Sequence, residues 1–218
     1  MTDFFNQLVQ LGVPLLLGAV TTIGITLASF SGAIILGLAL ALIRLLGFRL
    51  VNVLISGYVE VLRNTPVLAQ LFIIYFSLPS LGIMIDPVPA AIIGLSLNGG
   101  AVLSEVFRSG LNAIHHGQRE AALAVGMTPW MNLRYIILPQ TWRITLPPLG
   151  NYAIALLKDT AVVSAIAAPE IMFWARNLVT STFQTTFVYI LAAILYFCLS
   201  FPLARLVERF ERRQSAWL

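Results

Sequence analysis

Apolar residues run along this chain in long blocks that contain no charge. Four blocks lack Asp, Glu, Lys and Arg and cover residues 4–43, 64–85, 87–104 and 177–204. A helix needs about 20 apolar residues to cross a bilayer, so each block is long enough to span a membrane. A fifth block, 144–157, becomes long enough only if Lys158 and Asp159 lie inside the span. The pattern predicts an all-α integral membrane protein with five transmembrane helices, at about 18–43, 56–78, 88–108, 144–168 and 184–206.

Glycine, alanine and proline set further expectations for these helices. The Gly12–Pro14 segment is expected to break the start of the first block, so the span begins near residue 18. Pro66 is expected to kink the second span or to begin its membrane-buried part. Small residues recur four apart along the first span, which permits another helix to approach closely. They are Gly24, Ala28, Gly32, Ala33, Gly37 and Ala41.

The composition agrees with a membrane location and excludes several classes of protein. Hydrophobic residues make up 59% of the 218 positions and charged residues only 10%, and the mean hydropathy is +0.90. Too few polar residues are present to coat a soluble globule, so a soluble enzyme and a disordered chain are excluded. The single cysteine, Cys198, excludes an internal disulfide and a cysteine-based zinc site. The only lysine, Lys158, follows Leu157 and so belongs to no phosphate-binding P-loop.

The positive charges predict the orientation of the chain. Eleven of the 13 Lys and Arg residues fall after the first span, after the third span and in the tail. Cytoplasmic segments carry such an excess, so the N-terminus is expected outside and the C-terminus in the cytoplasm. Because the chain is so apolar, its basic pI of about 9.6 is interpreted as membrane orientation rather than as nucleic-acid binding.

The connection at 112–140 is long and of mixed polarity, unlike the other loops. Residues 118–125 are good helix formers, Gly126 is a stop signal, and Thr128 and Pro129 follow it. An apolar patch at 135–138 precedes Pro139. This amphipathic unit fits docking onto another protein, and it fits equally a helix that lies on lipid headgroups.

The same connection resembles a known family. Glu120, Ala121, Ala122, Gly126, Ile136, Leu138 and Pro139 match each spaced position of the EAA motif of ATP-binding cassette (ABC) importer permeases. From about Val20 onward the chain is similar to the polar amino acid permeases of the histidine, glutamine and arginine type. Two positions depart from the usual pattern: Asn64 replaces a glycine before Thr-Pro, and Ala161-Val162 replaces Ser-Leu.

The resemblance implies a type I ABC importer fold and a place in a larger machine. The chain would be a single permease domain, 1–218, multi-pass in the bacterial inner membrane. It would form a homodimer, or a heterodimer with a sister permease, above two cytoplasmic ATP-binding subunits. An extracytoplasmic solute-binding protein would deliver a polar amino acid. ATP and magnesium would be bound by the ATPase and no cofactor by this chain. The seven EAA-motif residues would couple the two subunits.

Ionisable and polar residues within the spans are candidates for contact with the substrate. An amino acid brings an ammonium and a carboxylate, and each needs a polar partner in a dry site. Asn98 and Glu105 lie two helical turns apart and are expected to face one lumen. Three glycines, Gly94, Gly99 and Gly100, permit a broken helix whose freed backbone groups line the path. The substrate-binding candidates are Asn98, Ser104, Glu105, Lys158, Asp159 and Thr160.

Two alternatives stay open from the residues alone. Glu105 and Asp159 could instead serve an ion-coupled carrier or an intramembrane enzyme, although neither protein would need an EAA loop. The same charges could also be structural, with Glu105 paired to Arg108 one turn later and Lys158 paired to Asp159.

Overall fold

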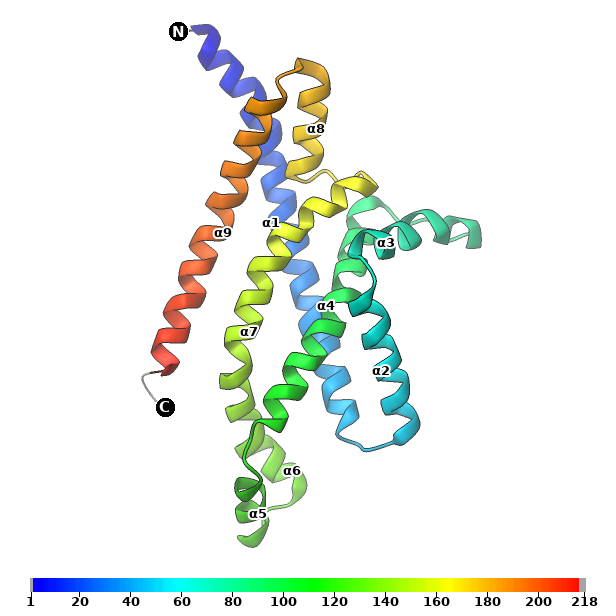
Figure 1. Ribbon diagram of the computed structural model, residues 1–218, viewed down its shortest axis with the longest axis vertical. Helices are drawn as coiled ribbons and strands as arrows, with labels where there is room; N and C mark the ends of the chain where they lie inside the picture. The colour runs from blue at the N-terminus through cyan, green and yellow to red at the C-terminus, as the bar shows by residue number, and fades with distance from the viewer. Residues whose placement is uncertain (1, 216–218) are drawn as a thin grey trace.

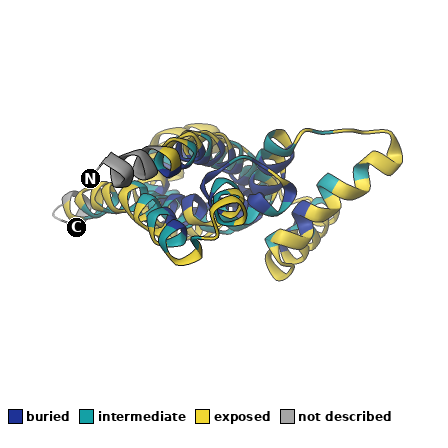
Figure 2. Ribbon diagram, turned by 90° about the horizontal axis from the view of Figure 1, so that it is seen from above, coloured by how far each residue is buried: buried dark blue, intermediate teal, exposed yellow. Residues whose placement is uncertain are grey.

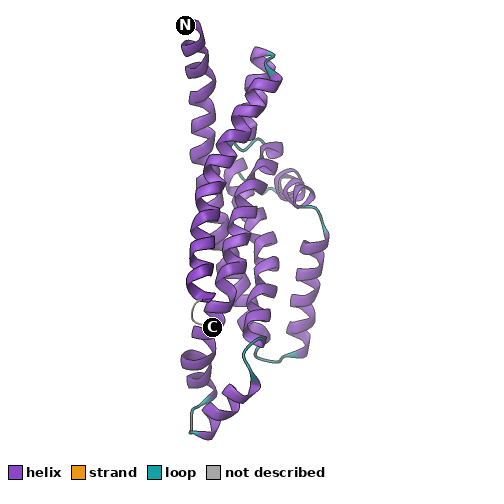
Figure 3. Ribbon diagram, turned by 60° about the vertical axis from the view of Figure 1, so that its left-hand side comes forward, coloured by secondary structure: helices purple, strands orange, loops and turns teal. Residues whose placement is uncertain are grey.

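The chain is a bundle of long helices, seen in a computed structural model that describes residues 2–215, with side chains described for residues 10–212 (Figure 1). No strand occurs between residues 2 and 215, as Figure 3 shows. The α-helices are α1 (Thr2–Arg44), α2 (Arg49–Asn64), α3 (Val67–Phe72), α4 (Pro87–Asn112), α5 (His116–Ala124), α6 (Pro129–Asn132), α7 (Leu138–Asp159), α8 (Ile171–Thr182) and α9 (Thr185–Ser215). Four short 3₁₀ or π segments join them: η1 (Ile73–Ser77), η2 (Leu78–Leu81), η3 (Leu133–Ile137) and η4 (Thr160–Ile166).

Among the described residues, four helices are long and apolar enough to cross a membrane by themselves. They are Gln10–Arg44, Pro87–Asn112, Pro129–Ile166 and Thr185–Arg212. A fifth span is obtained when Arg49–Asn64 and Val67–Leu81 are taken together, although the two parts are bent by 106°. The bend lies at Pro66, where the sequence predicted a kink.

The helix break expected at Gly12–Pro14 is wrong, and the break that the glycines of the third span permit does not occur. The first helix runs through Gly12 and Pro14 without interruption, because Leu11 and Leu15 on either side of the proline are buried against α8 and α9. The third span is also one continuous helix from Pro87 to Asn112. Its glycines provide room for neighbouring side chains rather than a break.

Close contact between α1 and α4 forms the centre of the bundle. A Cβ added at Gly37 would lie 2.9 Å from the Leu103 Cβ and from the Ser104 backbone nitrogen. A Cβ at Gly100 would lie 2.6 Å from Leu36. These positions accept only glycine at this helix separation, which confirms the close approach predicted from the small residues of α1.

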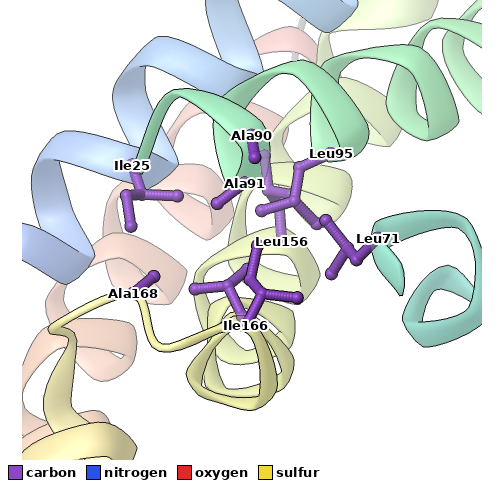
Figure 4. Close-up of a cluster of buried hydrophobic side chains, with 9 residues drawn as sticks. Ile25, Leu71, Ala90, Ala91, Leu95, Leu156, Ile166 and Ala168 are labelled. Atoms are coloured by element: carbon purple, nitrogen blue, oxygen red, sulfur yellow. The ribbon is translucent and has the colours of Figure 1, made fainter. Parts of the chain in front are cut away.

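Buried side chains from this helix pair and from three further segments meet in one cluster (Figure 4). Ile25 of α1, Leu95 of α4, Leu156 of α7 and Ile166 of η4 belong to one cluster. Leu71 of α3 joins the same cluster and is fully buried. The bent second span is thereby packed against η4, which begins at the Lys158-Asp159-Thr160 motif.

The outside of the bundle is apolar, as a surface in contact with lipid requires. Figure 2 shows buried residues along the middle of the bundle and exposed residues around it. On α9, Ile190, Ile194, Phe197 and Phe201 are all exposed. A soluble protein of this size avoids so large an apolar surface, and a membrane protein needs it.

Candidate functional site

The connection after α4 forms a compact helical unit at one end of the molecule, opposite the N-terminus (Figures 1 and 3). Its first helix, α5, is capped by His115, whose Nδ1 accepts a hydrogen bond from the Gly117 N–H at 3.1 Å. The helix stops where predicted, because Gly126 has a φ of +81°, a conformation that favours glycine. The Met127 N–H then donates to the Ala122 carbonyl at 3.0 Å and closes the last turn.

Side chains fix this unit to the end of the bundle. The Arg119 Nη2 donates to the Leu111 carbonyl at 2.8 Å, in the last turn of α4. The Arg119 carbonyl accepts a hydrogen bond from the Asn132 side-chain amide at 3.3 Å, and Asn132 is buried. One hydrogen bond therefore joins α5 directly to the last turn of α4, and a second joins α5 to α6.

The far side of the unit is open and apolar. Within the EAA motif, Ala122 is buried, whereas Glu120, Ala121 and Gly126 are exposed. Ile136 and Leu138 are half-buried and Pro139 is exposed. The uncovered residues also include large apolar side chains, namely Leu123, Val125, Trp130 and Tyr135. The exposed residues of α5, α6 and η3 thus combine large apolar side chains with the charged Glu120 and Arg134, a composition that occurs at protein interfaces.

Glu105 lies in an ion-pair network near the same end of the bundle. One carboxylate oxygen accepts a hydrogen bond from Arg44 Nη1 at 2.7 Å, and the other accepts one from Arg108 Nη2 at 2.6 Å. Arg44 Nη2 also donates a hydrogen bond to Ser56 Oγ at 3.2 Å. The structural alternative for Glu105 predicted the pair with Arg108, and Arg44 additionally ties α1 to α4 and α2.

Asn98 is directed at the break in the second span. Its Nδ2 donates to the Leu62 carbonyl at 3.0 Å and to Gln70 Oε1 at 3.2 Å. Gln70 Nε2 donates to the Leu62 carbonyl at 2.8 Å and to Thr65 Oγ1 at 2.8 Å. Asn98 thus contacts α2 and α3, whereas Glu105 contacts Arg44 of α1 and Arg108 of α4, so each is engaged by protein groups.

The other candidates occupy two further places. Ser104 and Thr160 are buried, and each hydroxyl donates to a carbonyl three residues earlier, at 2.8 and 2.7 Å. Lys158 and Asp159 are exposed at the end of α7, and among the described residues neither forms an ion pair within 4.0 Å. Among the described residues, no side-chain hydrogen bond or salt bridge joins any two of the six predicted residues.

Sequence reasoning missed a buried polar cluster around Glu170. This side chain is fully buried and caps α8, accepting hydrogen bonds from the N–H groups of Met172 and Phe173 at 2.9 and 2.7 Å. The Tyr196 hydroxyl of α9 donates to the same carboxylate at 2.5 Å. Glu170 is the only acid between Asp159 and Glu208, and this isolation was the available signal.

Comparison with known proteins identifies the family of this chain. Residues 33–216 match the model of the family described as binding-protein-dependent transport system inner membrane component. The chain belongs to this family. It is a permease, a transport subunit of an ABC importer of the inner membrane, and ATP hydrolysis in this family is carried out by a separate ATPase.

Three named relatives are similar to this chain over most of its length. The glutamine transport system permease protein GlnP of Escherichia coli K12 is 34% identical over 93% of this chain and 94% of its own length. The L-cystine permease TcyB of Bacillus subtilis is 39% identical, covering 94% and 88%. The arginine permease ArtQ of Bacillus subtilis is 35% identical, covering 97% and 96%.

Solved structures confirm the type I permease fold. An amino acid ABC transporter crystallised with histidines superimposes with a TM-score of 0.90 at 33% identity, covering 96% of this chain and 98% of that one. The MetNI methionine transporter shares the fold with a TM-score of 0.70 at 21% identity, covering 90% and 95%.

Proposed function

We propose that this chain forms the membrane path of an importer for polar amino acids and is driven through its EAA-motif unit. Relatives named for glutamine, L-cystine and arginine support the substrate class. The observation that carries the proposal is the set of exposed apolar side chains on α5, α6 and η3, a unit that the Arg119–Leu111 hydrogen bond joins to α4. Apolar side chains of this kind are exposed in an isolated subunit when a partner protein covers them in the assembled complex.

In this proposal the ATPase binds the exposed face and moves α5 as a unit. Ala121 permits a close approach because its side chain is small, and Glu120 beside it offers a carboxylate to a basic partner group. Ala122, Gly126 and the Ile136–Pro139 segment keep the shape of the unit. Movement then passes through Arg119 and Leu111 into α4. ATP and magnesium belong to the ATPase, and this chain needs no cofactor.

The assembly proposed around the chain follows from its orientation. The EAA-motif unit lies at the end that carries most of the arginines, so this end is cytoplasmic and the N-terminus lies outside. Two permease chains, identical or sister subunits, enclose the path, with an extracytoplasmic solute-binding protein above and the ATPase pair below. Lys158 and Asp159 are our candidates for substrate contact because both side chains are exposed in the isolated chain, at the edge of η4.

A matched pair of tryptophan substitutions tests the coupling. Ala121→Trp enlarges an exposed side chain on the proposed docking face, and Ala193→Trp enlarges an exposed side chain on α9. Each variant is co-expressed with its ATPase and binding protein, purified, and assayed for ATP-dependent amino acid uptake in proteoliposomes. We expect Ala121→Trp to lose the ATPase and uptake, and Ala193→Trp to keep both. Full uptake by Ala121→Trp would refute coupling through this face.

A further inference from the structure

The second helix has three different faces although it lies within a membrane span. One face, with Ile55 and Val59, is buried against α1 and α4. A second face is exposed and aliphatic, formed by Leu50, Leu54 and Val61. The third face carries a polar stripe of residues three or four apart: Arg49, Asn52, Ser56, Glu60 and Arg63. At 100° per residue these five side chains fall on one flank, opposite the aliphatic flank.

The polar stripe extends well into the membrane. Arg49 follows the short loop after α1, at the cytoplasmic boundary of the bundle, and Glu60 lies about 16 Å further along the helix axis. Half of a hydrocarbon core is about 15 Å thick, so Glu60 and Arg63 are near the middle of the bilayer. In the described part of the chain, no salt bridge joins these two side chains or pairs either with another residue. Charged groups at this depth face water or protein, because lipid cannot solvate them.

A hollow lies along the stripe. Its volume is about 570 Å³, and Asn52, Ser56 and Glu60 line it together with Gly47 and Gly57. Arg44 extends the polar surface through its hydrogen bond to Ser56. Two buried polar atoms next to it, Asn52 Oδ1 and Arg44 Nε, have no hydrogen-bond partner among the described residues. Unsatisfied polar atoms beside a hollow are positions that water fills.

From these observations we propose that the polar stripe of α2 lines the cytoplasmic half of the translocation path. The stripe binds the amino acid zwitterion as it leaves the path for the cytoplasm. Glu60 presents a carboxylate to the ammonium group, and Arg63 and Arg49 present guanidinium groups to the carboxylate. The aliphatic flank faces lipid. This inference rests on the proposed import function and adds the surface that the substrate crosses after leaving the residues near η4.

Cysteine accessibility distinguishes the two flanks at equal depth. Cys198 is the only cysteine, so Cys198→Ser provides the background. Ser56→Cys and Arg63→Cys lie on the polar stripe, and Leu54→Cys and Val61→Cys are their controls on the aliphatic flank. Each variant is assembled with ATPase and binding protein in proteoliposomes and treated from the cytoplasmic side with a charged, membrane-impermeant methanethiosulfonate. Labelling rates are read by mass spectrometry, with and without transported amino acid.

We expect the stripe cysteines to react about tenfold faster than their controls, because the thiolate forms in water and not in lipid. Excess amino acid should slow the reaction at Arg63→Cys. Equal rates on both flanks would overturn the proposal. So would rapid disulfide formation between Ser56→Cys residues of two chains, which would identify the stripe as a contact between permease subunits. Complexes that hydrolyse ATP and import substrate while the stripe stays unreactive would refute this inference and leave the import function intact.

Discussion

The Asn98 side-chain amide donates to the Leu62 carbonyl, the carbonyl that Pro66 cannot satisfy. In a continuous helix the N–H of residue 66 would donate to residue 62, and proline has no N–H. Instead, the Leu62 carbonyl accepts hydrogen bonds from Gln70 Nε2 at 2.8 Å and from Asn98 Nδ2 at 3.0 Å. Two amides on α3 and α4 therefore hold the second span in its bent form.

Replacing Gln70 should destabilise the bent span. Gln70→Leu removes the donor to the Leu62 and Thr65 oxygens and the acceptor of Asn98 Nδ2, so that only Asn98 still donates to the Leu62 carbonyl. Each lost hydrogen bond costs about 0.5–1.5 kcal/mol. Thermal unfolding of the purified protein in detergent measures the loss. Asn64→Ala is the control, because its side chain is exposed and bonds only within α2. A melting temperature unchanged by Gln70→Leu would show that the bend does not depend on this amide.

The two arginines bound to Glu105 should contribute unequally. The Arg44 side chain is 13% exposed and the Arg108 side chain 46%. An exposed ion pair contributes about 0–1 kcal/mol, whereas removal of one partner from a largely buried pair costs about 3–5 kcal/mol. We expect Arg44→Ala to lower the melting temperature much more than Arg108→Ala. Equal losses would contradict the assignment of Arg44 as the partner that joins α1 to α4.

Two glycines on α1 make a matched test of helix packing. A Cβ at Gly18 would lie 2.9 Å from backbone atoms of Glu170 and Ile171, and a Cβ at Gly12 would meet nothing within 4 Å. Overpacking against backbone costs about 1–3 kcal/mol. Gly18→Ala should therefore lower the thermal stability in detergent, and Gly12→Ala should leave it unchanged or raise it slightly. A neutral Gly18→Ala would mean that α8 moves away from α1 without cost.

The buried carboxylate of Glu170 should matter more than the hydroxyl that binds it. Glu170→Ala removes the cap of α8, worth about 1–2 kcal/mol, and also leaves the Tyr196 hydroxyl without this acceptor. Tyr196→Phe removes one donor and keeps both backbone bonds to the cap. Limited proteolysis of the α8 region, followed with time, should show faster cleavage in Glu170→Ala than in Tyr196→Phe. The reverse order would place the main support of α8 on α9.

Much of this architecture could be predicted from the sequence because membrane helices need length and apolarity. Helices cover most of each block without charge, although block 64–85 follows the bend at Pro66 and block 177–204 is divided between α8 and α9. Gly126 became a helix stop with positive φ. These features depend on local chemistry. The break expected at Pro14 and the break permitted at Gly99 did not form because tertiary packing decided both positions: Leu11 and Leu15 hold the helix around Pro14, and Ala33 and Tyr152 take up the space beside Gly99.

The candidate residues of the spans were harder to assign because their partners are distant in sequence. Nothing near Glu105 in the sequence indicates Arg44, and nothing near Asn98 indicates Leu62. The polar stripe of α2 is visible in the sequence only when the helix is given the right start and end. Glu170 escaped notice for a similar reason, since its hydroxyl partner lies on the next span.

The pairing of Glu170 with Tyr196 also bears on how the protein is made. The chain emerges from the ribosome N-terminus first, so Glu170 and the helix it caps are synthesised before Tyr196 exists. Until α9 is inserted, this carboxylate lacks its hydroxyl donor at a place that becomes fully buried. Completion of the end of the bundle that carries α8 therefore waits for the last span, and a chain truncated before α9 would present to the quality-control proteases of the cell an acidic group that the finished protein conceals.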